Sequence, residues 1–395
     1  MDIVILADFS GSFDGRTNNR FMYLANMLSE EHSVELVTSD FHHGSKTHFA
    51  KTPEDYPFKV TMLHEAQYKK NISLKRFYSH FVWGSEVKKY LKKRKKPDVI
   101  YCAVPTLYAS YNAAKYCKKN GVKFIVDIQD LWPEAFKMVL RIPVVSDIIF
   151  APFTFLANGI YKRADEIVAV SDTYVNRAQR VNKKGNNGHT VYLGTRLETY
   201  DGGASQAPLY TKPEGEIWIG YCGTLGASYD IPNLIYAIKQ LGEKGISNLK
   251  LIVMGDGARR ADFEAIAEQS GINCLFTGRL PYGDMCAQLT QCDIVVNPIK
   301  RGSAASIINK HADYAASGLP VVNSQESREY RELIERYNMG LNCKNEDAND
   351  MADKLEMLVA NRELRIEMGK NARRCAEERF DRKNSYKEIA DAIVG

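Results

Sequence analysis

Short apolar runs alternate with helix-length segments along this chain of 395 residues. Residues 293–298 (DIVVNP) are one such run, and a helix-length segment then ends at Gly318 before the next run starts at Val321. Continuously apolar strands are typical of sheets buried on both faces, and their alternation with helices predicts parallel sheets covered by helices. With this length and a hydrophobic share of 45%, the chain suits two such domains.

The segment after residues 293–298 carries the residues most suited to a ligand. Small residues fill positions 302–306, so backbone amides there can approach a ligand closely. The helix that follows places Lys310 and Asp313 three residues apart, hence on one face. A loop that opens a helix binds anions, so we expect a phosphate or diphosphate beside Lys310 and a ribose diol on Asp313. The alternative is an ordinary strand–helix–strand crossover with a solvated lysine and aspartate.

Five residues of this segment resemble a known family: Asn309, Lys310, Asp313, Tyr314 and Gly318. They are similar to the S-K-x-x-E-Y-x-A-x-G-x-P-V segment of retaining family 4 glycosyltransferases, in the branch that builds bacterial capsule, exopolysaccharide and O-antigen sugars. The resemblance implies an α/β protein of the GT-B fold. Such a protein has two Rossmann-like parallel-sheet domains facing across a cleft, and a C-terminal helix that crosses back to the first domain.

This fold gives the expected domain bounds. Residues 1–196 would be the acceptor-side domain and residues 216–378 the nucleotide-sugar-binding domain. Residues 197–215 hold three glycines and two prolines with little periodicity, so we expect an irregular linker there. Residues 379–395 would be the helix that packs on the first domain.

The resemblance also implies donor-binding residues beyond Lys310 and Asp313. These lie in loops at strand ends: Gly15, Arg16, Gly223, Thr224, Asp256, Gly257, Arg279, Ser306 and Asn309. For the loop at Gly15 a plain connecting turn is the alternative, and for the loop at Gly223 the alternative is an unusual donor. The wider family supplies Arg and Lys where this chain has Thr224 and Tyr229, and a second acid where it has Ala305. Charge neutralisation would therefore come from backbone amides, Lys310, and Lys300 or Arg301.

A second specific motif follows the apolar run that ends at Ile128. It reads D-L-W-P-E over residues 130–134 and resembles the same glycosyltransferase branch. Ligands of open α/β sheets bind beyond the carboxyl ends of strands, where this loop should lie. Asp130 matches the aspartate of the family's H-D pair, with Gln129 at the histidine position, so we expect Asp130 to face the sugar or the acceptor. The alternative is an aspartate that caps a helix.

Residues 41–70 carry His42, His43, His48 and His64. Because no carboxylate or cysteine stands at ligand spacing, we expect a polar loop with solvated histidines rather than a metal site. The eight cysteines of the chain lack C-x-x-C spacing, which favours reduced thiols in the cytoplasm. No metal and no other cofactor are expected.

Residues 69–96 form a basic segment, and seven Lys or Arg residues lie between positions 88 and 96. We expect a helix over residues 73–96, in which aromatic residues are interleaved among these charges. Such a helix could lie on the anionic inner face of the cell membrane. A solvated helix face is the alternative. No nucleic-acid reader motif accompanies the charge, so nucleic acid is not expected as a partner. The first residues lead directly into a strand, and no signal peptide is expected.

Together these features predict a metal-independent retaining hexosyltransferase. It would move a sugar from a UDP- or GDP-sugar to a saccharide or polyprenyl-diphosphate-linked acceptor in surface polysaccharide biosynthesis. Lys310 and Asp130 are the expected catalytic residues, because the departing diphosphate must be stabilised as its charge develops. Two alternatives remain open, a sugar-nucleotide epimerase on the same fold and a degenerate protein that binds nucleotide sugars without turnover.

Overall fold

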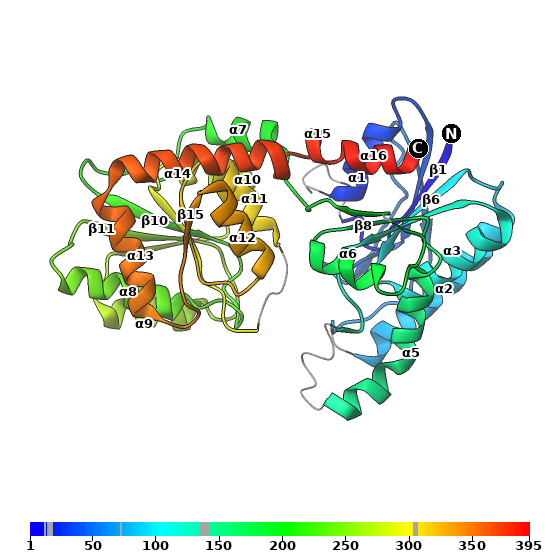
Figure 1. Cartoon of the computed structure of the whole chain (residues 1–395), viewed down its shortest axis with the longest axis horizontal. Helices are drawn as coiled ribbons and strands as arrows, with labels where there is room; N and C mark the ends of the chain where they lie inside the picture. The colour runs from blue at the N-terminus through cyan, green and yellow to red at the C-terminus, as the bar shows by residue number, and fades with distance from the viewer. Residues whose placement is uncertain (12, 14–18, 72, 135–142, 186, 303–306) are drawn as a thin grey trace. The chain divides into compact units, whose positions relative to one another are not determined.

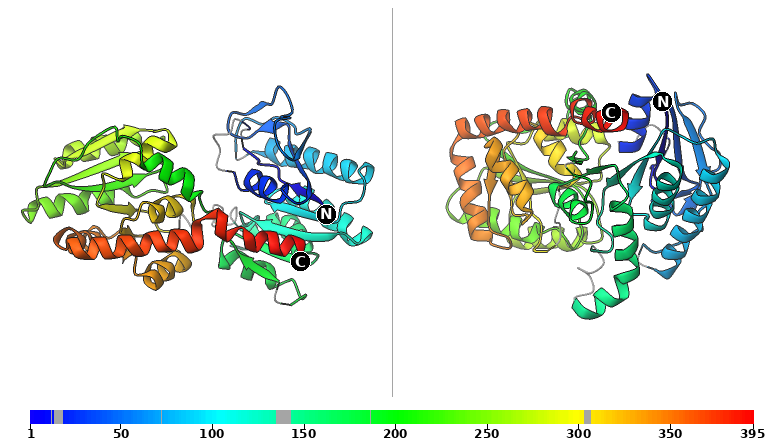
Figure 2. Two further views of the ribbon diagram at one scale, coloured as in Figure 1. Left: turned by 90° about the horizontal axis from the view of Figure 1, so that it is seen from above. Right: turned by 45° about the vertical axis from the view of Figure 1, so that its right-hand side comes forward.

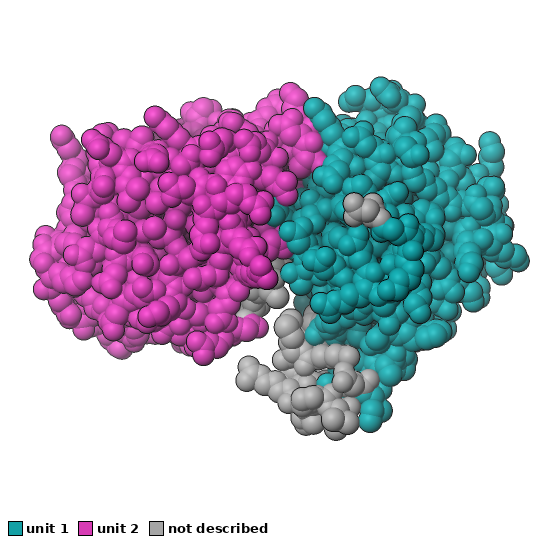
Figure 3. Space-filling view, viewed as in Figure 1, with its two compact units in different colours: residues 1–192, 386–395 teal, residues 193–385 magenta. Residues whose placement is uncertain are grey.

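The computed structural model describes residues 1–11, 13, 19–71, 73–134, 143–185, 187–302 and 307–395. The chain divides into two compact units (Figure 3). Unit 1 is Met1–Tyr192 with Tyr386–Gly395, and unit 2 is Leu193–Ser385. Each unit contains one parallel sheet covered by helices, which confirms the predicted fold class.

The sheet of unit 1 has the strand order β5-β2-β1-β6-β7-β8-β9, and all neighbouring pairs are parallel. Its strands are β1 (Asp2–Leu6), β2 (Ser33–Ser39), β5 (Lys59–Leu63), β6 (Val99–Val104), β7 (Lys123–Ile128), β8 (Glu166–Ala169) and β9 (Gly188–Thr190). The central strands are buried on both faces, as their continuous apolar sequences predict. A small antiparallel hairpin, β3 (Phe41–His42) and β4 (Thr47–His48), follows β2.

Helices cover both faces of this sheet (Figures 1 and 2). On one face, α1 (Arg20–Leu28) packs with the last helix, α16 (Lys387–Val394). Ile389 and Ile393 of α16 are fully buried in the same apolar cluster as Leu24 of α1. The C-terminal helix is therefore part of the core of unit 1, as the fold class predicted. Among the described residues, the remaining helices of this unit are α2 (Leu74–Lys93), α3 (Leu107–Asn120) and α5 (Pro143–Tyr161), which pack together, and α6 (Asp172–Gln179).

The sheet of unit 2 has the order β12-β11-β10-β13-β14-β15, again parallel throughout. Its strands are β10 (Ile217–Cys222), β11 (Leu249–Met254), β12 (Cys274–Gly278), β13 (Ile294–Asn297), β14 (Val321–Asn323) and β15 (Gly340–Asn342). Helices α8 (Ile231–Glu243), α9 (Arg260–Ser270) and α13 (Ala348–Ala360) share an apolar cluster with this sheet. The other helices are α7 (Leu197–Ala204), α10 (Tyr282–Leu289), α11 (Asn309–Ala316), α12 (Arg328–Tyr337), α14 (Arg362–Cys375), the π-helix η1 (Ala376–Phe380) and α15 (Arg382–Ser385).

Residues 197–215 differ from the irregular linker that the sequence predicted. Their first part is the helix α7, which belongs to unit 2 and packs against α10. A β-carbon on Gly203 would lie 2.9 Å from the Cα atom of Gly283 in α10. Gly203 therefore allows the two helix backbones to approach closely, and its absence of a side chain reflects packing rather than a flexible connection.

The described helices include none that is both long and apolar enough to cross a membrane.

Candidate functional site

In unit 2 the strand order reverses between β10 and β13, which makes this position the switch point of the sheet. Ligands of open α/β sheets bind beyond the carboxyl ends of the strands at this point. The hydroxyl of Tyr314 in α11 bridges the two strand ends. It accepts a hydrogen bond of 3.0 Å from the Cys222 amide and donates one of 3.0 Å to the Val296 carbonyl. These bonds hold α11 against the switch point.

Lys310 lies on the first turn of α11 and extends toward the loop that follows β10. It is buried, with 8% of its surface exposed, and its Nζ atom has no hydrogen-bond partner among the described residues. The Nζ atom lies 4.2 Å from the ring centre of Tyr221 and 4.1 Å from that of Tyr229. A β-carbon placed on Gly223 would be 3.0 Å from Nζ, so the ammonium ends directly beside this loop.

Two effects act on the charge of Lys310. Burial lowers the pKa of the Lys310 ammonium to about 7, against a smaller opposing effect of Cys222. The two tyrosine rings favour the charged form, because a cation is attracted to the face of an aromatic ring. Buried polar groups in proteins almost always have partners, so an anionic ligand at the Gly223 loop would complete this arrangement.

The loops after β10 and β11 meet through their backbones. The Leu225 amide donates a 2.9 Å hydrogen bond to the Asp256 carbonyl, and Gly223 has a φ of 139°. A β-carbon on Gly255 would lie 1.8 Å from the Gly223 carbonyl oxygen, which no side chain can tolerate. The structure thus brings together Gly223, Asp256 and Gly257, three of the residues predicted to bind the donor. The Asp256 carboxylate itself is exposed and accepts a 2.8 Å hydrogen bond from the Gly257 amide.

Asp313 lies on α11, one turn beyond Lys310. Its Oδ1 atom accepts a 2.8 Å hydrogen bond from the hydroxyl of Tyr282, which lies 3.0 Å from Thr195 Oγ1. Burial raises the pKa of Asp313 to about 6, while the Tyr282 hydroxyl, the charge of Arg382 and the Thr195 hydroxyl act in the opposite direction. A ribose diol on Asp313 would therefore share or replace the hydrogen bond from Tyr282.

The other predicted donor residues fall into two groups. Thr224, Arg279 and Asn309 have exposed side chains at the strand ends of unit 2. The Thr224 carbonyl accepts a 2.8 Å hydrogen bond from the Tyr221 hydroxyl, which fixes the loop beneath Lys310. The second group, Gly15, Arg16 and Ser306, lies outside the described residues, as does Ala305.

Sequence reasoning missed the asparagines that end three neighbouring strands. Asn297, Asn323 and Asn342 are in register, and each is joined to the next by an amide hydrogen bond of 2.9 Å. Asn297 also lies 3.2 Å from Nε2 of His311, whose ring stacks on Tyr330 at 3.5 Å. This buried network anchors α11 next to Lys310. The sequence feature that could have predicted this network is the recurrence of Asn at the last position of successive strands.

Unit 1 has its own switch point, between β1 and β6, and polar residues gather there too. Thr106 Oγ1 donates a 2.8 Å hydrogen bond to Asp8 Oδ2, while Oδ1 of Asp8 is buried without a partner among the described residues. Ligating atoms of Asp8, Glu65 and His80 lie within 4.8 Å of one another. Burial, followed by the charge of Glu65, raises the pKa of Asp8 well above its ordinary value. Burial, followed by the charge of Arg76, lowers the pKa of His80 to about 3.

A cavity of about 220 Å³ opens beside this cluster. Its lining includes Asp8, Ser10, Asn19, Ser39, His42 and His43. The D-x-W-P-E loop borders the same cluster, because the Trp132 ring stacks on His80 with ring centres 5.4 Å apart. Trp132 Nε1 donates a 3.2 Å hydrogen bond to Asp130, and burial raises the pKa of that carboxyl. Trp132 therefore links the predicted residue Asp130 to His80 of this cluster, while Asp130 itself is not among the residues that line the cavity.

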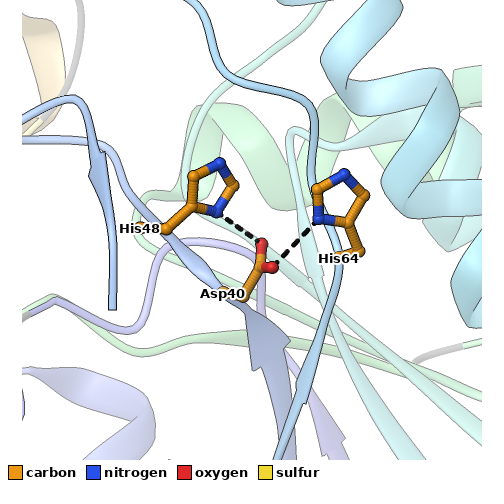
Figure 4. A group of neighbouring side chains, drawn as sticks. All are labelled: Asp40, His48 and His64. Carbon is orange, nitrogen blue, oxygen red and sulfur yellow. Dashed lines mark hydrogen bonds and ion pairs between the residues drawn. The ribbon is translucent and has the colours of Figure 1, made fainter. Parts of the chain in front are cut away.

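His48 and His64 are exposed, as predicted, but the expectation that no carboxylate lies near them is wrong. His48 and His64 both contact the carboxylate of Asp40, which precedes the histidine-bearing segment (Figure 4). The spacing of residues along the chain did not predict this arrangement, because the three residues lie on different strands or at their ends. Asp40 follows β2, His48 belongs to β4 and His64 follows β5.

Two parallel-sheet units with polar sites at their strand ends define the GT-B class of proteins. Within this class, residues 206–375 match the family described as Glycosyl transferases group 1. An uncharacterized glycosyltransferase of Methanocaldococcus jannaschii is 25% identical over 243 residues, which cover 60% of each chain. The putative colanic acid biosynthesis glycosyl transferase WcaI of Escherichia coli is 23% identical over 327 residues, covering 77% of this chain and 75% of WcaI.

The fold is also found in a solved structure, that of Anabaena Alr3699/HepE in complex with UDP. The TM-score is 0.70 at 16% identity, and the alignment covers 99% of each chain. The shared architecture confirms the GT-B fold, and the family match and the two relatives show that the chain is similar to glycosyltransferases.

Proposed function

We propose that this protein is a retaining glycosyltransferase that uses a nucleoside-diphosphate sugar and a saccharide acceptor. The observation that carries the proposal is the buried Nζ atom of Lys310, which lies at the switch point of unit 2 beside the Gly223 loop. In the transfer step the bond from the anomeric carbon to the diphosphate breaks, and a bond to the acceptor oxygen forms. The acceptor proton leaves with the diphosphate.

Each donor-binding residue has a role that follows from this step. Charge develops on the leaving diphosphate, and preorganised cations and amides stabilise it most effectively in a water-poor site. Lys310 supplies the cation, the loop at Gly223 supplies backbone amides, and Asp313 accepts the ribose hydroxyls. These groups can neutralise the diphosphate without a metal ion. The neighbour HepE was solved with UDP and with UDP-glucose, which supports a UDP-sugar, with a GDP-sugar as the alternative.

We place the acceptor in unit 1, at the cavity beside Asp8. Carboxyl and imidazole groups that are buried with free hydrogen-bonding capacity, such as Asp8 and His80, suit the hydroxyls of a sugar ring. Asp130 would face this acceptor through its position next to Trp132. The name of the relative WcaI supports a place in surface polysaccharide biosynthesis.

The acceptor would be lipid-linked, and the protein would work in the cytoplasm at the inner face of the membrane. Helix α2 exposes Leu74 and Tyr78, with 87% and 62% of their surfaces accessible, next to Lys75. Apolar side chains beside basic ones are the composition of a helix that binds an anionic lipid surface.

The test is a thermal-shift screen of nucleotide sugars, followed by a nucleotide-release assay with saccharide acceptors. Binding stabilises the folded state by mass action, so the true donor raises the unfolding temperature. A transferase releases free UDP or GDP only when an acceptor is added, and Lys310→Ala should lower this turnover at least ~100-fold. Release of no nucleotide with any acceptor, together with interconversion of the sugar, would identify an epimerase. Donor binding without either reaction would identify a degenerate binding protein.

A further inference from the structure

Asp40, His48 and His64 form a compact group on unit 1 (Figure 4). Asp40 Oδ1 lies 3.1 Å from Nδ1 of His48, and Asp40 Oδ2 lies 3.0 Å from Nδ1 of His64. The ligating atoms all lie within 4.8 Å of one another. Both imidazole rings thus turn the same nitrogen toward one carboxylate.

Backbone pairing fixes these three positions. Strands β2 and β5 are parallel, with Ser39 opposite Leu63, so the residues that follow them, Asp40 and His64, lie side by side. The Asp40 amide donates a 2.9 Å hydrogen bond to the Leu63 carbonyl. The hairpin β3–β4 then folds back and places His48 opposite Phe41. The group is therefore built by the sheet and the hairpin and not by a chance meeting of surface side chains.

The distances suit a metal ion as well as they suit hydrogen bonds. For the carboxylate to accept from both rings, each imidazole must carry its proton on Nδ1. A divalent transition metal would replace both protons and bind three lone pairs at once. In a tetrahedral Zn²⁺ site the bonds of about 2.0–2.2 Å place ligand atoms slightly more than about 3 Å apart. The two N···O distances of 3.1 and 3.0 Å are close to this value.

The surroundings of the group also favour a cation. Among the described residues, only the two histidines form ion pairs with Asp40. The Glu65 amide donates a 2.9 Å hydrogen bond to Asp40 Oδ1, which orients the carboxylate as partners of metal ligands commonly do. His64 is 61% exposed at its side chain, so a solvent molecule can reach the remaining coordination position.

A second group with ligand-like spacing, Asp8, Glu65 and His80, does not suit a cation in the same way. The positive charge of Arg76 acts on both Asp8 and His80. The carboxylate of Glu65 already accepts a 2.6 Å hydrogen bond from Ser39 and a second hydrogen bond from Ser79.

We propose that Asp40, His48 and His64 bind one divalent transition metal ion, with Zn²⁺ as the natural guest of two imidazoles and a carboxylate. The ion joins the end of β2, the end of β5 and the β3–β4 hairpin. Phe41, His42, His43 and Gly44 of this hairpin region line the cavity beside Asp8, so the metal stabilises one wall of that cavity. The ion has a structural role and takes no part in the transfer step.

The test uses the full chain without an affinity tag, stripped of metal with a chelator. Zn²⁺ is titrated in competition with a chromophoric chelator, and Co²⁺ is added separately to record the visible absorption of the bound ion. His64→Ala is the main variant, because its exposed side chain can be removed without opening the core. His42→Ala is the matched control, since His42 lies in the same hairpin but bonds to Ser45.

We expect one equivalent of Zn²⁺ per chain, with affinity at least about 100-fold weaker in His64→Ala and in His48→Ala. Zn²⁺ should raise the unfolding temperature of the wild type and of His42→Ala, but not that of His64→Ala. Without metal, the unfolding temperatures of the wild type and of the three variants should be similar. Wild-type affinity in His64→Ala, or the same weak uptake in every variant, would overturn the proposal.

Discussion

The Nζ atom of Lys310 lies 4.2 Å from the centre of the Tyr221 ring and has no described hydrogen-bond acceptor. The ring face favours the ammonium, whereas burial lowers the pKa of Lys310 to about 7. The two effects therefore oppose each other, and the charge of Lys310 is sensitive to its surroundings near neutral pH. A bound diphosphate would shift the lysine fully to the charged form, because an opposite charge nearby favours ionisation.

The pH dependence of stability should reveal the buried ammonium. Lys310 has a lower pKa in the folded chain than in the unfolded chain, so its destabilising effect is full below about pH 7. That effect disappears as the pH rises from about 7 toward 10.5. Lys310→Met should therefore raise the unfolding temperature most at pH 6 and least at pH 10.

The control for this series is Lys250→Met. Lys250 also lies over an aromatic ring, that of Trp218 at 5.2 Å, but it belongs to β11 and is partly exposed. Its replacement should change stability little and equally at all pH values. A pH-independent effect of Lys310→Met would show that Lys310 is fully charged in the folded chain.

The contact between the loops after β10 and β11 should not tolerate a methyl group. In Gly255→Ala the new β-carbon would lie 1.8 Å from the Gly223 carbonyl oxygen, so the loops must separate. We expect a loss of at least about 2 kcal/mol in the free energy of unfolding, measured by urea denaturation. Gly242→Ala in α8, where no atom lies within 4 Å of the new carbon, should be neutral or stabilising. Equal stability of the two variants would contradict the close approach of these loops.

Tyr282 should affect the pH below which donor binding weakens. Its hydroxyl hydrogen bond favours the ionised form of Asp313, whose pKa burial raises to about 6. Tyr282→Phe removes this bond, so the pKa of Asp313 should rise and donor binding should weaken at a higher pH than in the wild type. Donor affinity measured between pH 5 and pH 8 tests this shift. If the pH at which donor affinity is half lost is the same in Tyr282→Phe as in the wild type, donor binding does not depend on the ionisation of Asp313.

Membrane binding should depend on the exposed apolar residues of α2. Replacing Leu74 and Tyr78 together by serine should lower the sedimentation of the protein with anionic vesicles, by about 10-fold or more from the lost apolar area. Wild-type binding should also fall with rising salt. Ile366→Ser, at an exposed position of α14 in unit 2, is the control and should bind like the wild type. Equal sedimentation of all three proteins would exclude this surface.

The fold was predictable from the sequence because its short, continuous apolar runs alternate with helix-length segments along the chain. The strand that ends at Pro298 and the helix that ends at Gly318 are set by local chemistry, and the structure has β13 and α11 there. The motif around Lys310 likewise pointed to a strand-end site.

The partners of the site residues were not predictable in the same way. Tyr282 reaches Asp313 from 31 positions away, and Asp40 meets His64 through the pairing of two strands. Such contacts depend on strand order and register, which the spacing of residues along the chain does not record. The irregular linker predicted around Gly203 was wrong because glycine is favoured both in flexible linkers and where two backbones pack closely.

Calorimetric binding of UDP and GDP at pH 8, in two buffers of different ionisation enthalpy, tests the central claim most directly. If Lys310 contacts the diphosphate, binding of the nucleotide should be accompanied by uptake of protons, because a lysine whose pKa is lowered to about 7 is largely neutral at pH 8 and becomes charged beside the ligand. Lys310→Met should lose this uptake and bind at least about 10-fold more weakly, while Lys250→Met behaves like the wild type. Equal affinity and equal proton uptake in Lys310→Met would contradict the account.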